Sequence, residues 1–342
     1  MNSSISSSET AGPGPDARNW RLFSRLMLLT AAGLTAALLG LALLLDPFDT
    51  GRTPLAFESG VRPQGPRTAA ASRGRDPAFQ AAIFGNSHVQ QLSPAELTRA
   101  TGIPFVSLIA PATGPRETLT LIDWFLRHHP GAARAVIVGV DAMWCTADPA
   151  FPNDKPFPYW LFARGWGEYL AGLVSLNVVE ELPRRVALLL SRKAERARPD
   201  GYWDYEPNYV GLGYASNPEI RARLQARSDG GGGGNATGPF PAASRLEALL
   251  SAAPDTALVL LRPPLYATAL PLPGSADAAA NEACTRAFAA LAERRPKTVL
   301  IDWRRDRPEL RDPNQFFDHS HYRSPIARLI EADIAAALAR LR

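Results

Sequence analysis

The chain has 342 residues, of which 46% are hydrophobic and 20% are charged. This composition excludes an intrinsically disordered chain, and the length allows one large domain or two small ones. The formal net charge is only +4, and the arginines are scattered without an aromatic-rich basic stripe, so we expect no nucleic-acid partner.

A hydrophobic run near the N-terminus predicts a membrane anchor. Residues 1–26 contain Ser, Gly and Pro and are expected to form an unstructured cytoplasmic tail. Residues 27–45, MLLTAAGLTAALLGLALLL, carry no charge; as a helix they would extend roughly 28 Å, close to the hydrocarbon thickness of a bilayer. A signal peptide has a shorter apolar core and a small-x-small cleavage site. This run ends in Leu-Leu-Leu-Asp-Pro-Phe, so we predict an uncleaved transmembrane helix.

The charges that flank this anchor predict its orientation. Arg18, Arg21 and Arg25 precede it, whereas two aspartates follow it before the next arginine. Positive charge is enriched on the cytoplasmic side of membrane proteins. We therefore expect a single-pass protein of the cytoplasmic (inner) membrane, with its N-terminus inside and its main domain in the periplasm or outside the cell.

The remainder of the chain divides into a linker and an α/β domain. Residues 46–78 are rich in Pro, Gly, Ser and Arg without sustained periodicity, which predicts a tether. From residue 79 to 342, short apolar runs alternate with helical patterns. The predicted strands cover residues 81–84, 105–109, 135–140, 257–261 and 298–301, and the predicted helices cover residues 94–101, 117–128, 277–294 and 324–341. This alternation predicts a mostly parallel five-stranded sheet with helices on both faces.

A long insertion, at about residues 145–245, interrupts this pattern. It contains a helical pattern over 177–194 and the glycine run 230–234, and insertions of this length are usually functional or disordered. Its aromatic side chains, with Trp160 and Trp203 as candidates for substrate binding, stack on sugar rings or form a small core of their own. Cys145 and Cys284 either form a disulfide or are two unpaired core residues, and the sequence leaves both open.

Two polar motifs are candidates for a functional site. One follows the first predicted strand, and the other precedes the last predicted helix. Ligands of parallel sheets bind at the carboxyl ends of the strands, and Gly85-Asn86-Ser87 lies directly after the first strand. Ser87 is either a helix cap or a nucleophile, which would need a base. Asp318 and His321, three residues apart near the C-terminus, have the spacing for a carboxylate to hold one imidazole nitrogen while the other faces a hydroxyl.

These two motifs resemble those of the SGNH (GDSL-like) hydrolase superfamily, over roughly residues 79–342. The resemblance implies a flavodoxin-like, three-layer α/β/α fold and a serine hydrolase or acyltransferase. It implies Ser87 as the nucleophile, His321 as the general base and Asp318 as the residue that orients His321. Asn86 stands where the family usually has an aspartate.

The expected oxyanion hole departs from the family pattern. The third family block reads Gly-x-Asn-Asp and its asparagine donates to the oxyanion, whereas this chain has Asp141 at the corresponding place. A carboxylate donates only when it is protonated. The other expected donors are the backbone N–H groups of Ser87 and Gly114. One missing donor costs about 2.7–4 kcal/mol of barrier. A slow site, a site that recruits another donor and an inactive site therefore all stay open.

Two further polar groups have competing interpretations. Arg262 follows the fourth strand, where it either contacts an anionic substrate or pairs with an internal carboxylate. His319 lies between Asp318 and His321, but a His-x-His turn without further ligands is weak evidence for a metal. We therefore predict neither a metal site nor a cofactor.

The anchor narrows the function that the resemblance implies. With its N-terminal anchor, this chain resembles the membrane-tethered members of the superfamily. Those proteins help to acylate envelope polymers such as alginate and teichoic acid, and they work beside a membrane-bound O-acyltransferase. By this analogy we expect an esterase or acetyl-type O-acyltransferase that acts on a cell-envelope polysaccharide through an acyl-enzyme. The alternative is a catalytically inactive binding or scaffold protein of a polysaccharide assembly or acylation complex.

Overall fold

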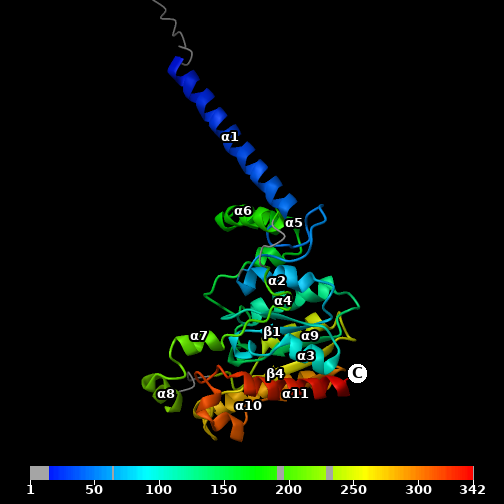
Figure 1. Cartoon of the computed structure of the whole chain (residues 1–342), viewed down its shortest axis with the longest axis vertical. Helices are drawn as coiled ribbons and strands as arrows, with labels where there is room; N and C mark the ends of the chain where they lie inside the picture. The colour runs from blue at the N-terminus through cyan, green and yellow to red at the C-terminus, as the bar shows by residue number, and fades with distance from the viewer. Residues whose placement is uncertain (1–14, 64, 191–195, 229–233, 342) are drawn as a thin grey trace, which may run out of the picture.

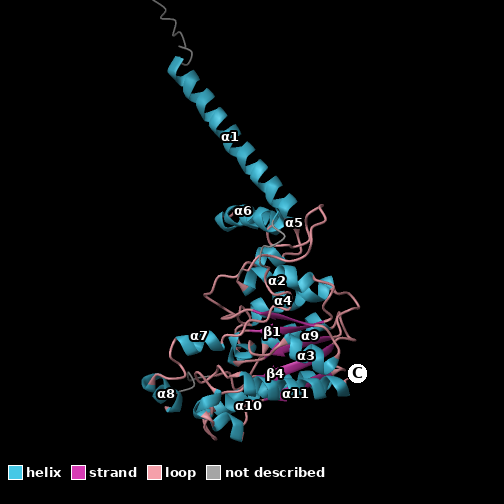
Figure 2. Cartoon of the chain, in the orientation of Figure 1, coloured by secondary structure: helices cyan, strands magenta, loops and turns pink. Residues whose placement is uncertain are grey.

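A five-stranded, all-parallel sheet forms the centre of the domain (Figures 1 and 2). The computed structural model describes residues 15–63, 65–190, 196–228 and 234–341. The strands are β1 (Ala81–Gly85), β2 (Phe105–Ile109), β3 (Ala135–Gly139), β4 (Ala257–Arg262) and β5 (Thr298–Asp302), in the order β2-β1-β3-β4-β5. The predicted α/β fold is confirmed, and each strand matches its predicted range to within one residue at either end.

Helices cover both faces of this sheet. Side chains of β1 alternate between two cores: Ala82 and Phe84 belong to one, Ala81 and Ile83 to the other, as the two-residue period of a strand requires. The first core is covered by α2 (Pro66–Arg75), α4 (Pro115–His128), α9 (Pro241–Leu250) and α10 (Ala276–Arg294). The second is covered by α3 (Pro94–Thr101) and α11 (Ser324–Arg340). The result is the predicted three-layer arrangement.

One long N-terminal helix, α1 (Pro15–Leu45), projects from the domain (Figure 1). Its segment Arg18–Leu45 is apolar enough, by length and composition, to cross a membrane. Only its last turns pack on the domain, where Ala42 is fully buried. The unstructured tail predicted for residues 1–26 is wrong for residues 15–26, because the helix begins at Pro15, a residue favoured in the first turn. The rest of that tail, residues 1–14, lies outside the described residues.

The segment predicted as a tether is folded onto the domain in its described parts, residues 46–63 and 65–78. Its helix α2 buries Ala69, Ala70, Ala71 and Ser72, and the hydroxyl of Ser72 donates to Asp49 at 2.5 Å. This prediction needs correction because α2 packs through small side chains. A search for large apolar residues at helical spacing does not detect such a helix.

The insertion between β3 and β4 is mainly helical. Its helices are α5 (Trp166–Leu173), α6 (Leu176–Leu190), α7 (Glu206–Gly211) and α8 (Pro218–Gln225), followed by α9. The helix predicted over 177–194 is α6 as far as residue 190, and residues 191–194 lie outside the described residues. Of the glycine run 230–234, only Gly234 is described.

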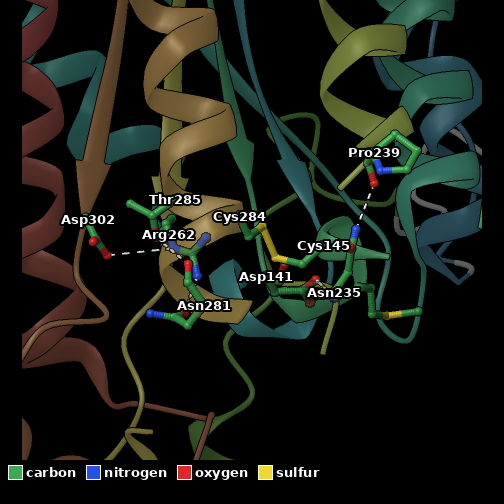
Figure 3. Close-up of a disulfide and its surroundings, with 10 residues drawn as sticks. Asp141, Cys145, Asn235, Pro239, Arg262, Asn281, Cys284, Thr285 and Asp302 are labelled. Atoms are coloured by element: carbon green, nitrogen blue, oxygen red, sulfur yellow. Dashed lines mark hydrogen bonds and ion pairs between the residues drawn. A yellow bond between two sulfur atoms is a disulfide. The ribbon is translucent and has the colours of Figure 1, made fainter. Parts of the chain in front are cut away.

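A disulfide joins this region to α10. Cys145, the last residue of the 3₁₀ helix η2 (Ala142–Cys145), is bonded to Cys284, with a Cα–Cα distance of 5.4 Å (Figure 3). Of the two possibilities that the sequence left open for the cysteines, the structure has the disulfide.

Candidate active site

In the turn after β1, the helix cap is Asn86, and the hydroxyl of Ser87 has no capping role. Gly85 has a φ of 147°, and a Cβ at this position would lie 2.7 Å from Val89, so the turn requires glycine. The 3₁₀ helix η1 (Ser87–Val89) follows, and the Oδ1 atom of Asn86 caps it by accepting from the backbone N–H of His88 at 3.1 Å. The following helix, α3, is capped by Ser93. Neither cap uses the hydroxyl of Ser87.

The structure brings Ser87 together with Asp318 and His321. The Nε2 atom of His321 lies 2.9 Å from the Oγ atom of Ser87. Its Nδ1 atom lies 2.9 and 2.8 Å from the two carboxylate oxygens of Asp318. These distances are within the range expected of a nucleophile, its base and the group that orients the base. The contact joins the end of β1 to the segment before α11 across 234 residues.

Asp318 is held as an anion. Burial on its own would raise the pKa of this carboxyl, but the hydrogen bond and charge of His321 and two backbone N–H groups outweigh it and hold the pKa well below its usual range. Those N–H groups belong to Ser320 and His321, at 2.9 and 2.8 Å from Oδ1. An ionised Asp318 accepts a hydrogen bond from the Nδ1–H group of His321. In that tautomer of the imidazole, the Nε2 atom that faces Ser87 is left as an acceptor.

A second carboxylate, Asp141, holds the other side of the turn. It is buried, and its Oδ2 atom accepts from Asn86 Nδ2 at 2.6 Å and is 3.0 Å from His88 Nδ1. Its Oδ1 atom accepts from the backbone N–H of Met143 at 2.9 Å. Burial opposes ionisation, but the hydrogen bonds of His88 and Asn86, together with the charges of His88 and Arg304, lower the pKa of Asp141 overall. Asp141 is therefore an acceptor on both oxygens. It supplies no donor for an oxyanion, although it occupies the sequence position at which the family has the donating asparagine.

The other expected oxyanion donors differ in availability. The backbone N–H of Gly114 donates to Glu117 at 2.8 Å within the cap of α4, so it is already used. The N–H of Ser87 begins η1, and the first N–H groups of a helix have no partner within that helix. Of the three residues predicted for the oxyanion hole, Ser87 alone is left with a donor suited to this role.

The insertion contributes aromatic rings that pack around His321. The rings of Tyr205 and Tyr209 lie 5.7 and 5.3 Å from the imidazole, between centroids. Tyr205 is fixed by a hydrogen bond to the carbonyl of Tyr322 at 2.7 Å, and Tyr209 stacks on Phe317. Sequence reasoning did not single out Tyr209, although it ends the aromatic run GYWDYEPNY of residues 201–209, which was the available signal.

The three side chains predicted to bind substrate have different surroundings. Trp203 is 49% exposed, and its carbonyl accepts from Gln90 at 3.2 Å, next to η1. Trp160 is half-buried and makes ring contacts with Phe48 and Tyr169 beside the end of α1. Of the two possibilities that the sequence left open for it, these contacts favour core packing.

Arg262 is fully buried at the end of β4, so no substrate reaches it. Its Nη2 atom donates to Asn281 at 2.5 Å, and its Nε atom lies 3.9 Å from Asp302 (Figure 3). Burial, reinforced by the charge of Arg304, lowers the pKa of Arg262 to about 10. The prediction that Arg262 contacts substrate is wrong, because the side chain is buried. Of the two possibilities that the sequence left open, the structure has the internal carboxylate, Asp302.

No protein-family model matches this chain, and a search of curated proteins finds no match. The geometry of Ser87, His321 and Asp318 is therefore the main support for any functional assignment.

Proposed function

We propose that this protein is a membrane-anchored serine esterase or O-acyltransferase of the SGNH type. The observation that carries the proposal is the 2.9 Å approach of His321 Nε2 to Ser87 Oγ, with Asp318 on the opposite nitrogen. This order of hydroxyl, imidazole and carboxylate is the arrangement that activates a serine.

The proposed reaction has two halves. Ser87 Oγ attacks an acyl carbonyl while His321 Nε2 takes the hydroxyl proton, and Asp318 stabilises the imidazolium that forms. His321 then protonates the leaving alcohol, and the acyl group stays on Ser87 as an ester. In the second half a water or a sugar hydroxyl attacks that ester and gives its proton to His321 Nε2. The bond between the acyl carbon and Ser87 Oγ then breaks, and His321 returns the proton to Oγ, so the acyl group leaves on the acceptor oxygen and the free serine is restored.

Two features favour a cell-envelope polysaccharide as the substrate, and the acetyl-type acyl group is proposed by analogy with the membrane-tethered members of the superfamily. Trp203 and the half-buried Tyr209 beside His321 have the apolar faces and polar edges that suit sugar rings. The disulfide between Cys145 and Cys284 is typical of proteins in oxidising compartments, and so it favours a periplasmic or extracellular domain. A membrane-bound O-acyltransferase in the same membrane is the proposed partner that supplies the acyl group.

The oxyanion hole favours a second candidate, a catalytically inactive domain that binds polysaccharide or serves as a scaffold. Asp141 accepts on both oxygens and the N–H of Gly114 is occupied. A site with one donor where the family has three is expected to be slow, because each missing donor costs about 2.7–4 kcal/mol.

Labelling with a fluorophosphonate probe separates these two candidates. The full chain in detergent is exposed to the probe, and the labelled peptide is identified by mass spectrometry. We expect labelling at Ser87 that disappears in Ser87→Ala and falls strongly in His321→Ala. The matched control is Ser251→Ala, a hydroxyl bonded to Ala248 on the exposed surface, which should label like the wild type. A folded wild-type protein that takes no label on Ser87 supports the inactive binding domain instead.

A further inference from the structure

Helix α6 has apolar side chains on two opposite faces. One face is buried and includes Val178, Leu182 and Leu188. The other face carries Leu176, Val179, Pro183, Val186 and Leu190, at spacings of three and four residues, and all five are exposed. Leu176 is 72% and Leu190 80% exposed. Residues at this spacing lie on one side of a helix, so α6 presents a continuous apolar stripe that the described part of the domain leaves uncovered. We call these five residues the outer stripe.

The buried face of α6 fixes the helix to the end of α1. Arg185 donates from Nε to the carbonyl of Leu45 at 3.2 Å and from Nη1 to the carbonyl of Gly60 at 2.8 Å. Figure 1 shows α5 and α6 at the foot of α1, between that helix and the rest of the domain. Leu45 is also the last residue of the apolar segment that is long enough to span a bilayer. The outer stripe therefore lies where the chain leaves the proposed membrane segment.

Other exposed apolar side chains extend the stripe on neighbouring elements. Trp166 begins α5 and is 55% exposed, Val174 lies between α5 and α6, and Leu55 follows α1 in the chain. The guanidinium of Arg52 lies 5.5 Å from the Trp166 ring. Tryptophan and arginine together at such a position are typical of the interface between membrane and water. The apolar surface thus belongs to several elements around the end of α1.

The shape of this surface favours lipid over a protein helix. A helix that pairs in a coiled coil packs against an apolar seam of at least three to four heptads. The outer stripe is only about two heptads long. An amphipathic helix that lies in the plane of a membrane needs one apolar face directed to the acyl chains, with polar residues beside it. Asn177, Glu180 and Arg184 are exposed beside the stripe and supply that polar border.

We propose that the outer stripe of α6, with Trp166 and Val174, docks into the interfacial region of the lipid bilayer that α1 spans. This inference rests on the proposed membrane anchor. It adds a second contact with lipid beside α1, which restricts the tilt of the domain relative to the membrane.

Photo-crosslinking in the full chain tests this docking. The photoreactive residue p-benzoylphenylalanine replaces Leu176, Val179 or Leu190 in turn. The protein is reconstituted in vesicles of phosphatidylethanolamine and phosphatidylglycerol that contain a radiolabelled phospholipid. We expect several times more lipid label at these three positions than at Leu212 or Leu272, which are 70% and 56% exposed but follow α7 or precede α10, away from α1 (Figure 1).

A position within α1 separates failure of the docking from failure of the anchor. Leu34 is 68% exposed in the middle of the apolar segment and should take lipid label if α1 spans the bilayer. Label at Leu34 with only background label on α6 overturns the docking and leaves the anchor in place. Absence of label at Leu34 overturns both. A crosslink from α6 to a protein in native membranes, in place of lipid, also overturns the proposal. If the analogue disturbs folding at one stripe position, the other two report on the same face.

Discussion

Two carboxylates at the carboxyl edge of the sheet each hold one imidazole. Asp318 contacts Nδ1 of His321, and Asp141 contacts Nδ1 of His88. The two rings lie 5.4 Å apart in an edge-to-face arrangement. Only His321 also contacts the hydroxyl of Ser87, so the structure distinguishes the two histidines by their second nitrogen. Asp141 instead ties η1 to the loop after β3 through its bonds with Asn86 and His88.

The depressed pKa of Asp318 predicts a pH-dependent contribution to stability. Its pKa in the folded chain lies below the ordinary value of 3.8. A carboxyl with a lowered folded pKa stabilises the fold fully above its unfolded pKa, and this stabilisation is lost as the pH falls through that value toward the folded pKa. We therefore expect the difference in free energy of unfolding between the wild type and Asp318→Asn to shrink below about pH 4.

Urea unfolding of the full chain in detergent, at a series of pH values, measures this difference. The control Asp255→Asn changes a carboxylate that is 97% exposed, and its difference from the wild type should stay nearly constant. A difference for Asp318→Asn that does not vary with pH would contradict the proposed ionisation of Asp318 in the folded chain.

The substitution Asp141→Asn tests whether this residue organises the turn or merely lacks an oxyanion donor. The carboxylate accepts from Asn86, His88 and Met143. An amide offers one acceptor oxygen in place of two, so it leaves at least one buried donor unpaired. We expect Asp141→Asn to lower the free energy of unfolding by about 1–3 kcal/mol without raising the rate of probe labelling at Ser87. If the labelling rate rises and stability is kept, Asp141 is a position where an amide would serve the oxyanion.

At the scale of elements, the sequence predicts large apolar patterns well and small-residue packing poorly. The strands were predicted because each is a short apolar run, which is the pattern of a parallel strand. The strands β1 to β4 are buried on both faces, and β5 at the edge of the sheet is half-buried. The pairing of Ser87 with His321 was expected from two motifs, the polar turn after the first strand and the Asp-x-x-His spacing before the last helix, and from the family that they resemble. Helix α2 was missed because it buries alanines, and Tyr209 was missed because contact with His321 depends on the path of the insertion.

The close packing of α2 on α4 gives a prediction for this element. A Cβ at Gly74 would lie 2.7 Å from Cδ1 of Trp124, whereas a Cβ at Gly65, just before α2, would meet nothing within 4 Å. Alanine generally favours a helix over glycine, so a loss of stability in Gly74→Ala reports on the clash. We expect Gly74→Ala to lower the free energy of unfolding by about 1–3 kcal/mol, and Gly65→Ala to change it little. Equal stability of both variants would mean that residues 66–75 are a loose tether after all.

At the scale of the whole molecule, the position of α1 relates the candidate site to the membrane. Figure 1 places α2 and α4 between α1 and the sheet. The carboxyl ends of the strands, where Ser87 lies, therefore open to the side of the domain instead of toward α1. With α1 in the membrane as proposed, this opening would face along the membrane surface instead of toward it.

The disulfide tests on which side of the membrane the domain lies. Cys145 and Cys284 are 139 residues apart and join the loop after Asp141 to α10. A bridge of this kind forms and persists outside the cytoplasm. We expect both thiols to resist alkylation by a maleimide reagent when cells are lysed directly into it under denaturing conditions, and to react only after reduction. Two thiols that react without reduction would place the domain in the cytoplasm and contradict the predicted orientation.

The same bond predicts a large effect on stability when it is removed. Opening a loop of this length is expected to cost about 2–5 kcal/mol of the free energy of unfolding, so Cys145→Ser with Cys284→Ser should unfold at clearly lower urea concentration than the wild type. Since η2 directly follows Asp141, loosening it should also slow labelling of Ser87. The control is the wild-type protein under reducing conditions, which should behave like the double variant. If the double variant matches the oxidised wild type in both measurements, the loop after β3 is held by packing alone, and the disulfide reports only on the compartment.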